Sequence, residues 1–208
     1  MPKKALTHPR KTASQARSRL TVDALLEATA RILVKEGYDR ASTNKIAALA
    51  GVSIGSLYQY FPSKEALVAA VAERHAERAM GLARQTFARV ATSPVETALR
   101  ELVTLSVEAH RIDPELHRVL AEQVPRTGRL KNVEALTREA QGLLRSYLET
   151  HRDELAIEDL DMAAFICVTT VESLTHDAVL DHPEFLTGRK LPRLVDDITR
   201  LVARYLRK

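Results

Sequence analysis

One stretch, STNKIAALAGVSIGSLYQYFPSK (residues 42–64), constrains the fold of this chain more than any other. Thr43 is a candidate N-cap, because its hydroxyl can accept a hydrogen bond from an amide of the first helical turn. The residues that follow show helical spacing, with Ile46 and Leu49 predicted to face inward. Gly51 then ends the helix, since glycine readily adopts the left-handed conformation of a helix terminus.

A second short helix follows this glycine. Ser53 can cap it, Leu57 supplies a buried anchor, and the helix is predicted to run through Tyr60. The small side chain of Ala47 allows the two helices to approach closely. Two short helices around a glycine turn form a helix-turn-helix, whose second helix can enter the major groove of DNA.

The side chains of the second helix indicate a function more specifically than the spacing of the helix pair does. The run GVSIGSLYQYFPSKEAL resembles the recognition-helix signature of the TetR family of bacterial transcriptional regulators, and the resemblance extends over roughly residues 17–75. Two positions depart from the family pattern. Ile54 stands where a basic or polar residue is common, and Ser56 stands where threonine is common, so the operator sequence does not transfer from a relative.

The resemblance implies an all-α protein with a basic flexible arm (1–20), a helix-turn-helix DNA-binding domain (21–75) and a helical effector-binding and dimerisation domain (76–208). It implies a repressor that binds a palindromic operator in double-stranded DNA as a homodimer and is released by an unknown small molecule. An activator or architectural DNA-binding protein without an effector is an open alternative. The expected DNA contacts are Thr43, Asn44, Ile54, Gly55, Ser56, Tyr58, Gln59, Tyr60 and Lys64.

Charge supports a nucleic-acid partner. Residues 1–64 contain 11 basic and 4 acidic side chains, a net of +7, whereas residues 65–208 contain 20 and 23, a net of −3. A positive segment attracts a polyanion and gives salt-sensitive affinity. The first 20 residues are basic and free of acid, and they suit an arm that lies on DNA, a solubilising tail or a transit peptide.

Composition bounds the remaining classes. The chain has 208 residues and one cysteine, Cys167, which excludes an internal disulfide and fits a reducing cytoplasm. The family resemblance implies that this is the cytoplasm of a bacterium. No apolar run in the sequence approaches the ~20 residues of a membrane span, so a membrane-spanning helix is not expected.

Helical periodicity continues to the end of the chain and predicts about nine helices and no sheet. The first helix is expected over 21–36, capped by Thr21. A long fourth helix follows Ser63, and later helices are expected near 94–111, 114–124, 131–151, 158–181 and 191–206, with a loop over 125–128. Prolines fall at the starts of elements or in loops.

The last two helices are the predicted dimer surface. In the TetR family they pair with their copies in a four-helix bundle, and intramolecular core is the alternative. The residues expected there are Phe165, Thr169, Ser173, Leu194, Ile198, Leu201 and Tyr205.

The middle helices are the predicted effector site, with core packing again the alternative. Its candidate residues are Phe87, Leu102, Val103, Ser106, His110, His117 and Cys167.

Other chemistry has less support. Glu172 with His176, and Asp113 with His117, are each four residues apart on a helix, which suits either a metal or the commoner ion pair. His75 has no such neighbour in sequence. No metal or other cofactor is therefore expected. The sequence has no phosphate-binding loop or nucleophile motif, so an enzyme is not expected. A helical enzyme that retains a basic domain is a second alternative to the repressor, beside the activator or architectural protein named above.

Overall fold

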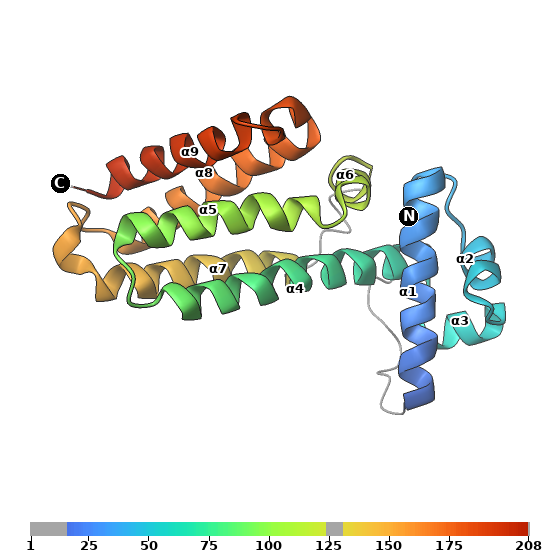
Figure 1. Cartoon of the computed structure of the whole chain (residues 1–208). Helices are drawn as coiled ribbons and strands as arrows, with labels where there is room; N and C mark the ends of the chain where they lie inside the picture. Colours follow the sequence, from blue (N-terminus) through green and yellow to red (C-terminus); the bar gives the residue numbers. More distant parts are fainter. Residues whose placement is uncertain (1–15, 124–130, 208) are drawn as a thin grey trace, which may run out of the picture. The chain divides into compact units, whose positions relative to one another are not determined.

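The computed structural model describes residues 16–123 and 131–207, and every regular element within these ranges is helical (Figure 1). The all-α prediction is confirmed. The chain divides into two compact units. Among the described residues, the first unit holds 16–76, 115–123 and 131–134, and the second holds 77–114 and 135–207.

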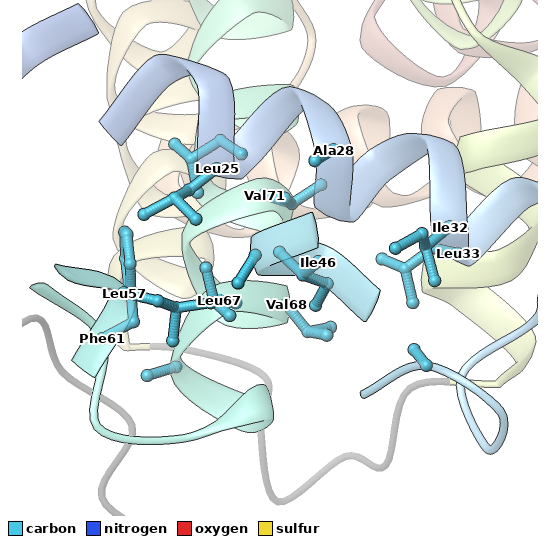
Figure 2. Packing of buried hydrophobic residues seen from close by; sticks show 14 of the residues in the cluster. Leu25, Ala28, Ile32, Leu33, Ile46, Leu57, Phe61, Leu67, Val68 and Val71 are labelled. Atoms are coloured by element: carbon cyan, nitrogen blue, oxygen red, sulfur yellow. The ribbon is translucent and has the colours of Figure 1, made fainter. Parts of the chain in front are cut away.

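The first unit is built around one apolar core (Figure 2). It contains α1 (Ala16–Glu36), α2 (Thr43–Ala50), α3 (Ile54–Tyr60), the first part of α4 (Lys64–Val90) and α6 (Pro114–Glu122). The largest fully buried side chains of this core are Leu25, Leu33, Ile46, Leu57, Phe61 and Leu67. Two residues of α6, Leu116 and Val119, belong to the same core, although the sequence placed their segment in the second part of the chain.

The first helix differs from its prediction at its start. It includes Ala16 to Leu20, so Thr21 lies inside the helix and does not cap it. Alanine, arginine and leucine in this segment all favour helix, and the basic composition that suggested a flexible arm does not oppose it. The rest of the predicted arm, residues 1–15, lies outside the described residues, as does the predicted loop at 125–128.

The second unit contains the rest of α4 and four further α-helices. These are α5 (Val95–Arg111), α7 (Lys131–Thr150), α8 (Leu160–Leu180) and α9 (Lys190–Leu206), with two short 3-10 helices, η2 (Arg152–Glu154) and η3 (Pro183–Leu186), that the sequence did not predict. The first four residues of α7 are an exception, because they belong to the first unit. Helix α5 packs against both α8 and α9. An isolated antiparallel bridge pairs Leu155, the residue after η2, with Arg207, the residue after α9.

By length and composition alone, α8 could span a membrane, which qualifies the expectation drawn from the sequence. In the structure, however, α8 packs against α5 and contributes Ala163, Ala164 and Cys167 to a buried cluster. This is the pattern of a core helix with one outward face.

Candidate nucleic-acid interface

Helix α2 begins one residue earlier than predicted. Its N-cap is Ser42, whose hydroxyl accepts a hydrogen bond from the amide of Lys45 at 3.4 Å, and Thr43 is the first helical residue. Ser42 has the extended backbone typical of an N-cap (φ −141°, ψ 151°). The assignment of the cap to Thr43 was therefore wrong by one position.

The turn between α2 and α3 has the geometry of a Schellman motif. Gly51 adopts the left-handed conformation (φ 67°, ψ 28°), and its amide donates to the carbonyl of Ala48 at 3.2 Å. The amide of Val52 donates to the carbonyl of Ala47 at 3.0 Å. This 6→1 and 5→2 pair satisfies the last carbonyls of α2. A Cβ added at Gly51 would meet nothing within 4 Å, so lack of space does not require glycine here. The positive φ favours glycine instead, because other residues rarely adopt it.

Helix α3 is capped and anchored from its inner side. The hydroxyl of Ser53 accepts a hydrogen bond from the amide of Ser56 at 3.1 Å, as predicted. Leu57 is 0% exposed and Phe61 is also buried, and both lie in the core of the first unit (Figure 2). This fixes which face of α3 points outward.

The outward face of α3 carries several of the predicted contacts. Ile54 and Tyr58 are 39% and 42% exposed, and Gly55 and Gln59 are also exposed. Ser56 is half-buried, and its hydroxyl lies 2.8 Å from that of Ser53. The structure thus brings a methyl-rich side chain, an amide and a phenol together along one edge.

Two residues of the motif lie differently from their prediction. Tyr60 is only 9% exposed and packs in the core of the first unit, which does not fit its predicted contact with phosphate. Leu49, predicted to face inward, is 52% exposed, because the rotation of α2 is set by Ile46 and Ala47 instead.

The start of α2 is linked to α3 by a side-chain hydrogen bond. The hydroxyls of Thr43 and Tyr58 lie 3.1 Å apart, and the neighbouring Asn44 is exposed. Polar groups from both helices therefore gather at one place, as phosphate binding requires.

Lys64, predicted to meet a phosphate, is half-buried at the start of α4. Its ammonium donates to the carbonyl of Tyr38 at 2.9 Å and lies 4.1 Å from the centre of the Tyr38 ring. Burial and the nearby carboxylate of Glu65 raise the pKa of the Tyr38 phenol. In this conformation Lys64 holds the α1–α2 connection in place.

A second lysine is occupied in the same region. The ammonium of Lys45 lies 2.6 Å from Glu36 Oε2 and 3.0 Å from the carbonyl of Arg40. The hydrogen bond from Lys45 lowers the pKa of Glu36. These contacts fix the entry to α2.

The predicted effector residues do not form one group. Phe87, Leu102 and Cys167 belong to one apolar cluster of the second unit, and Val103 belongs to another. His117 lies on α6 in the first unit, where its ring is 5.5 Å from that of His75, so His75 is not isolated.

Ser106 and His110 belong to a polar cluster between α5 and α8. The Ser106 hydroxyl donates to Glu172 Oε1 at 3.2 Å and lies 2.7 Å from the hydroxyl of Thr175. Glu172 was considered only as a partner of His176, and Thr175 was missed. The polar residues that interrupt apolar α8 at these positions were the available signal.

Most of the predicted dimer residues lie at the surface of the second unit. Phe165, Thr169, Ser173 and Leu201 are exposed, and Leu194 and Tyr205 are half-buried. Ile198 is 3% exposed and packs against α5 residues Val103 and Val107, so its assignment to the outer surface was wrong. It lies on the inward face of α9, where Val195 and Val202 are also buried.

Helices α2 and α3 are joined by a turn at Gly51 and expose a polar edge, and a second helical unit follows them. This is the architecture of a helix-turn-helix DNA-binding regulator. Residues 25–71 match the family described as "Bacterial regulatory proteins, tetR family", and residues 94–206 match "Tetracyclin repressor-like, C-terminal domain". The second match alone covers more than half of the chain, and the protein belongs to the TetR family of bacterial transcriptional regulators.

Individual relatives agree with this assignment. The chain is 31% identical over 147 residues to the HTH-type transcriptional repressor NicS of Pseudomonas putida, a match that covers 66% of this chain and 68% of NicS. The structure of NalD from Pseudomonas aeruginosa, the secondary repressor of the MexAB-OprM multidrug efflux pump, has a TM-score of 0.68 at 20% identity and covers 93% of this chain and 99% of NalD. SmeT, the repressor of the Stenotrophomonas maltophilia SmeDEF pump, has a TM-score of 0.64 at 24% identity, covering 90% of each chain. At these identities the two structures show the fold alone.

Proposed function

We propose that this regulator is a repressor that binds a palindromic operator as a homodimer through α3 and is released by a small-molecule effector. One observation carries the DNA-binding part. The exposed edge of α3 is polar and aromatic, while Leu57 and Phe61 hold its other side in the core. A helix anchored in this way can enter the major groove without unfolding.

Each exposed residue has a role in this proposal. Ile54 contacts a thymine methyl, Gln59 bonds to a base edge, and Gly55 allows the helix backbone to come close. Tyr58 and Thr43 bond to phosphate, with Asn44 beside them. The net charge of +7 over residues 1–64 supports the same partner.

Dimer formation is supported by the outer faces of α8 and α9. Met162, Phe165, Thr169 and Ser173 are spaced by three or four residues, so they share one face of α8, and all four are exposed. Leu201 is exposed on α9. Large apolar side chains at the surface of a helical unit favour burial against a second copy.

The effector part of the proposal rests on the second unit and on relatives. The family match over 94–206 covers this unit, and SmeT has been solved as a complex with triclosan. We place the effector among α5, α7 and α8. Binding of the effector would act through α4, which belongs to both units. This mechanism requires that the effector bind the DNA-bound and the released state of the repressor with different affinities.

Selection of bound duplexes from a random pool tests the DNA-binding part. The wild-type chain should enrich one palindrome, and the Gln59→Ala variant should enrich a different one. Identical sites for both proteins, or no enrichment by the wild type, would refute the role given to α3. Repeating the selection with candidate ligands tests release.

Light scattering with size-exclusion chromatography tests the dimer. Phe165→Asp should give a monomer of about half the mass. Phe185→Asp is the matched control, because Phe185 is also exposed but lies in η3. A dimer that survives Phe165→Asp would place the interface elsewhere.

A further inference from the structure

The C-terminal ends of α1 and α2 differ in what satisfies their backbone. Both helices are followed by a glycine with positive φ, 80° at Gly37 and 67° at Gly51. After Gly51, the amide of Val52 donates back to a carbonyl of its own helix. The corresponding amide after Gly37, that of Tyr38, donates instead to Gln123 Oε1 at 3.1 Å. The end of α1 is therefore completed by a side chain 85 positions further along the chain.

Gln123, the residue directly after α6, is held in place by the packing of that helix. Leu116 and Val119 of α6 are buried in the core of the first unit. The amide of Gln123 continues the helical pattern by donating to the carbonyl of Val119 at 3.0 Å. The side chain fits closely beside Gly37, where an added Cβ would lie 2.7 Å from Gln123 Oε1. Any other residue at position 37 would therefore displace the carboxamide of Gln123.

The connection between α1 and α2 also holds both cations of the helix-turn-helix. Lys45 and Lys64 are the only charged residues in the sequence from 42 to 64. The ammonium of Lys64 donates to the carbonyl of Tyr38 at 2.9 Å, and that of Lys45 donates to the carbonyl of Arg40 at 3.0 Å. Tyr38 thus contacts α6 through its amide and Lys64 through its carbonyl. The position of this connection decides where the two ammonium groups lie.

Fixed placement of these groups matters more for recognition of one sequence than for general attraction to DNA. Non-specific binding depends on charge, which an ammonium group keeps when it becomes mobile. Specific binding needs backbone contacts that set the register of the recognition helix on the base edges. Groups already ordered in the free protein lose less freedom when they bind. Loss of a contact that orders the connection should therefore reduce specific affinity and leave non-specific affinity nearly unchanged.

We propose that Gln123 is a positioning residue for operator recognition. It holds the α1–α2 connection, and with it Lys45 and Lys64, in the geometry that α3 needs to read base edges. The inference rests on the proposed binding of an operator through α3. It adds a determinant of sequence specificity that lies outside the helix-turn-helix itself.

Fluorescence anisotropy of the full chain tests this role with two duplexes of equal length, one selected by the wild type and one of random sequence. The readout is the ratio of the two affinities. In Gln123→Ala this ratio should fall by about 3–10-fold, the value of roughly one hydrogen bond, while affinity for the random duplex should change by less than about twofold. The urea midpoint should stay at the wild-type value, because Gln123 is exposed.

Gln85→Ala is the matched control, because Gln85 is also an exposed glutamine but lies in the second unit. It should keep the wild-type ratio. Gln123→Glu is the rescue variant, because it retains an acceptor oxygen for the amide of Tyr38. Lys35 and Arg40 line the same surface hollow as Gln123, so the fold should tolerate the added carboxylate. Its charge should weaken binding to both duplexes alike and leave their ratio unchanged.

Gly37→Ala tests the same contact from the other side, since its Cβ would displace the carboxamide. In that background Gln123→Ala should lower the ratio no further, because the strain of the positive φ is common to both proteins. A wild-type ratio in Gln123→Ala, a ratio lost in Gln85→Ala or Gln123→Glu, additive effects with Gly37→Ala, or a parallel fall of the urea midpoint would overturn this inference alone. A wild type that prefers no duplex would overturn the proposed function together with it.

Discussion

Truncation of Leu57 tests the physical basis of the helix-turn-helix directly. Its side chain is 0% exposed and belongs to the same apolar core as Leu25, Phe61 and Leu67 (Figure 2). Leu57→Ala removes buried apolar contacts and leaves a cavity, which costs about 2–5 kcal/mol depending on how far the site relaxes. Since a whole domain is stable by only about 5–15 kcal/mol, this is a large share of the total.

Leu49→Ala is the matched control. Both residues are leucines of the same helix pair, but Leu49 is 52% exposed. Its truncation should change the free energy of unfolding by no more than about 0.5 kcal/mol. The comparison therefore isolates burial from residue type and from helix propensity, which are the same in the two substitutions.

Urea unfolding gives the measurement, followed by circular dichroism and by tyrosine fluorescence, since three of the five tyrosines lie in the first unit. With a slope of about 2 kcal/mol per M, a loss of about 2–5 kcal/mol in Leu57→Ala should lower the unfolding midpoint of the first unit by about 1–2.5 M. Operator affinity should fall with the folded fraction. Equal midpoint shifts for the two variants would refute the packing and the orientation of α2 and α3 described above.

Three further predictions follow from local contacts. Ser53→Ala removes the cap that accepts from the Ser56 amide, and it should lower the free energy of unfolding in urea by about 1 kcal/mol. The guanidinium of Arg84 lowers the pKa of Glu139 below its usual 4.5, so the stabilisation from this pair is present above that pH and is lost as the pH falls through the lowered folded value. In thermal melts, the melting temperature of Glu139→Gln should therefore fall less in acid than that of the wild type. Equal falls would contradict a stabilising pair between Arg84 and Glu139. Burial raises the pKa of Cys167 to about 12, so its native thiol should react with Ellman's reagent at pH 8 far more slowly than the urea-unfolded thiol, and similar rates would contradict its burial.

The sequence by itself determined the elements whose causes are local. The left-handed glycine at 51, the cap at Ser53 and the buried anchor Leu57 each depend on residues within one or two turns, and the structure has all three. The family signature and the all-α class were read from the same short-range patterns. Helix ends such as Ala16 were less predictable, because weakly amphipathic residues extend a helix without a clear start signal.

Only the tertiary structure decided which face each helix turns inward. Leu49 and Ile198 are both apolar residues in periodic helices, yet one is exposed and the other buried, because neighbouring helices select the face. The meeting of Ser106 with Glu172 joins side chains 66 positions apart, and no local pattern encodes it. The placement of His117 with the first unit depends likewise on packing between distant segments, which a single sequence does not reveal.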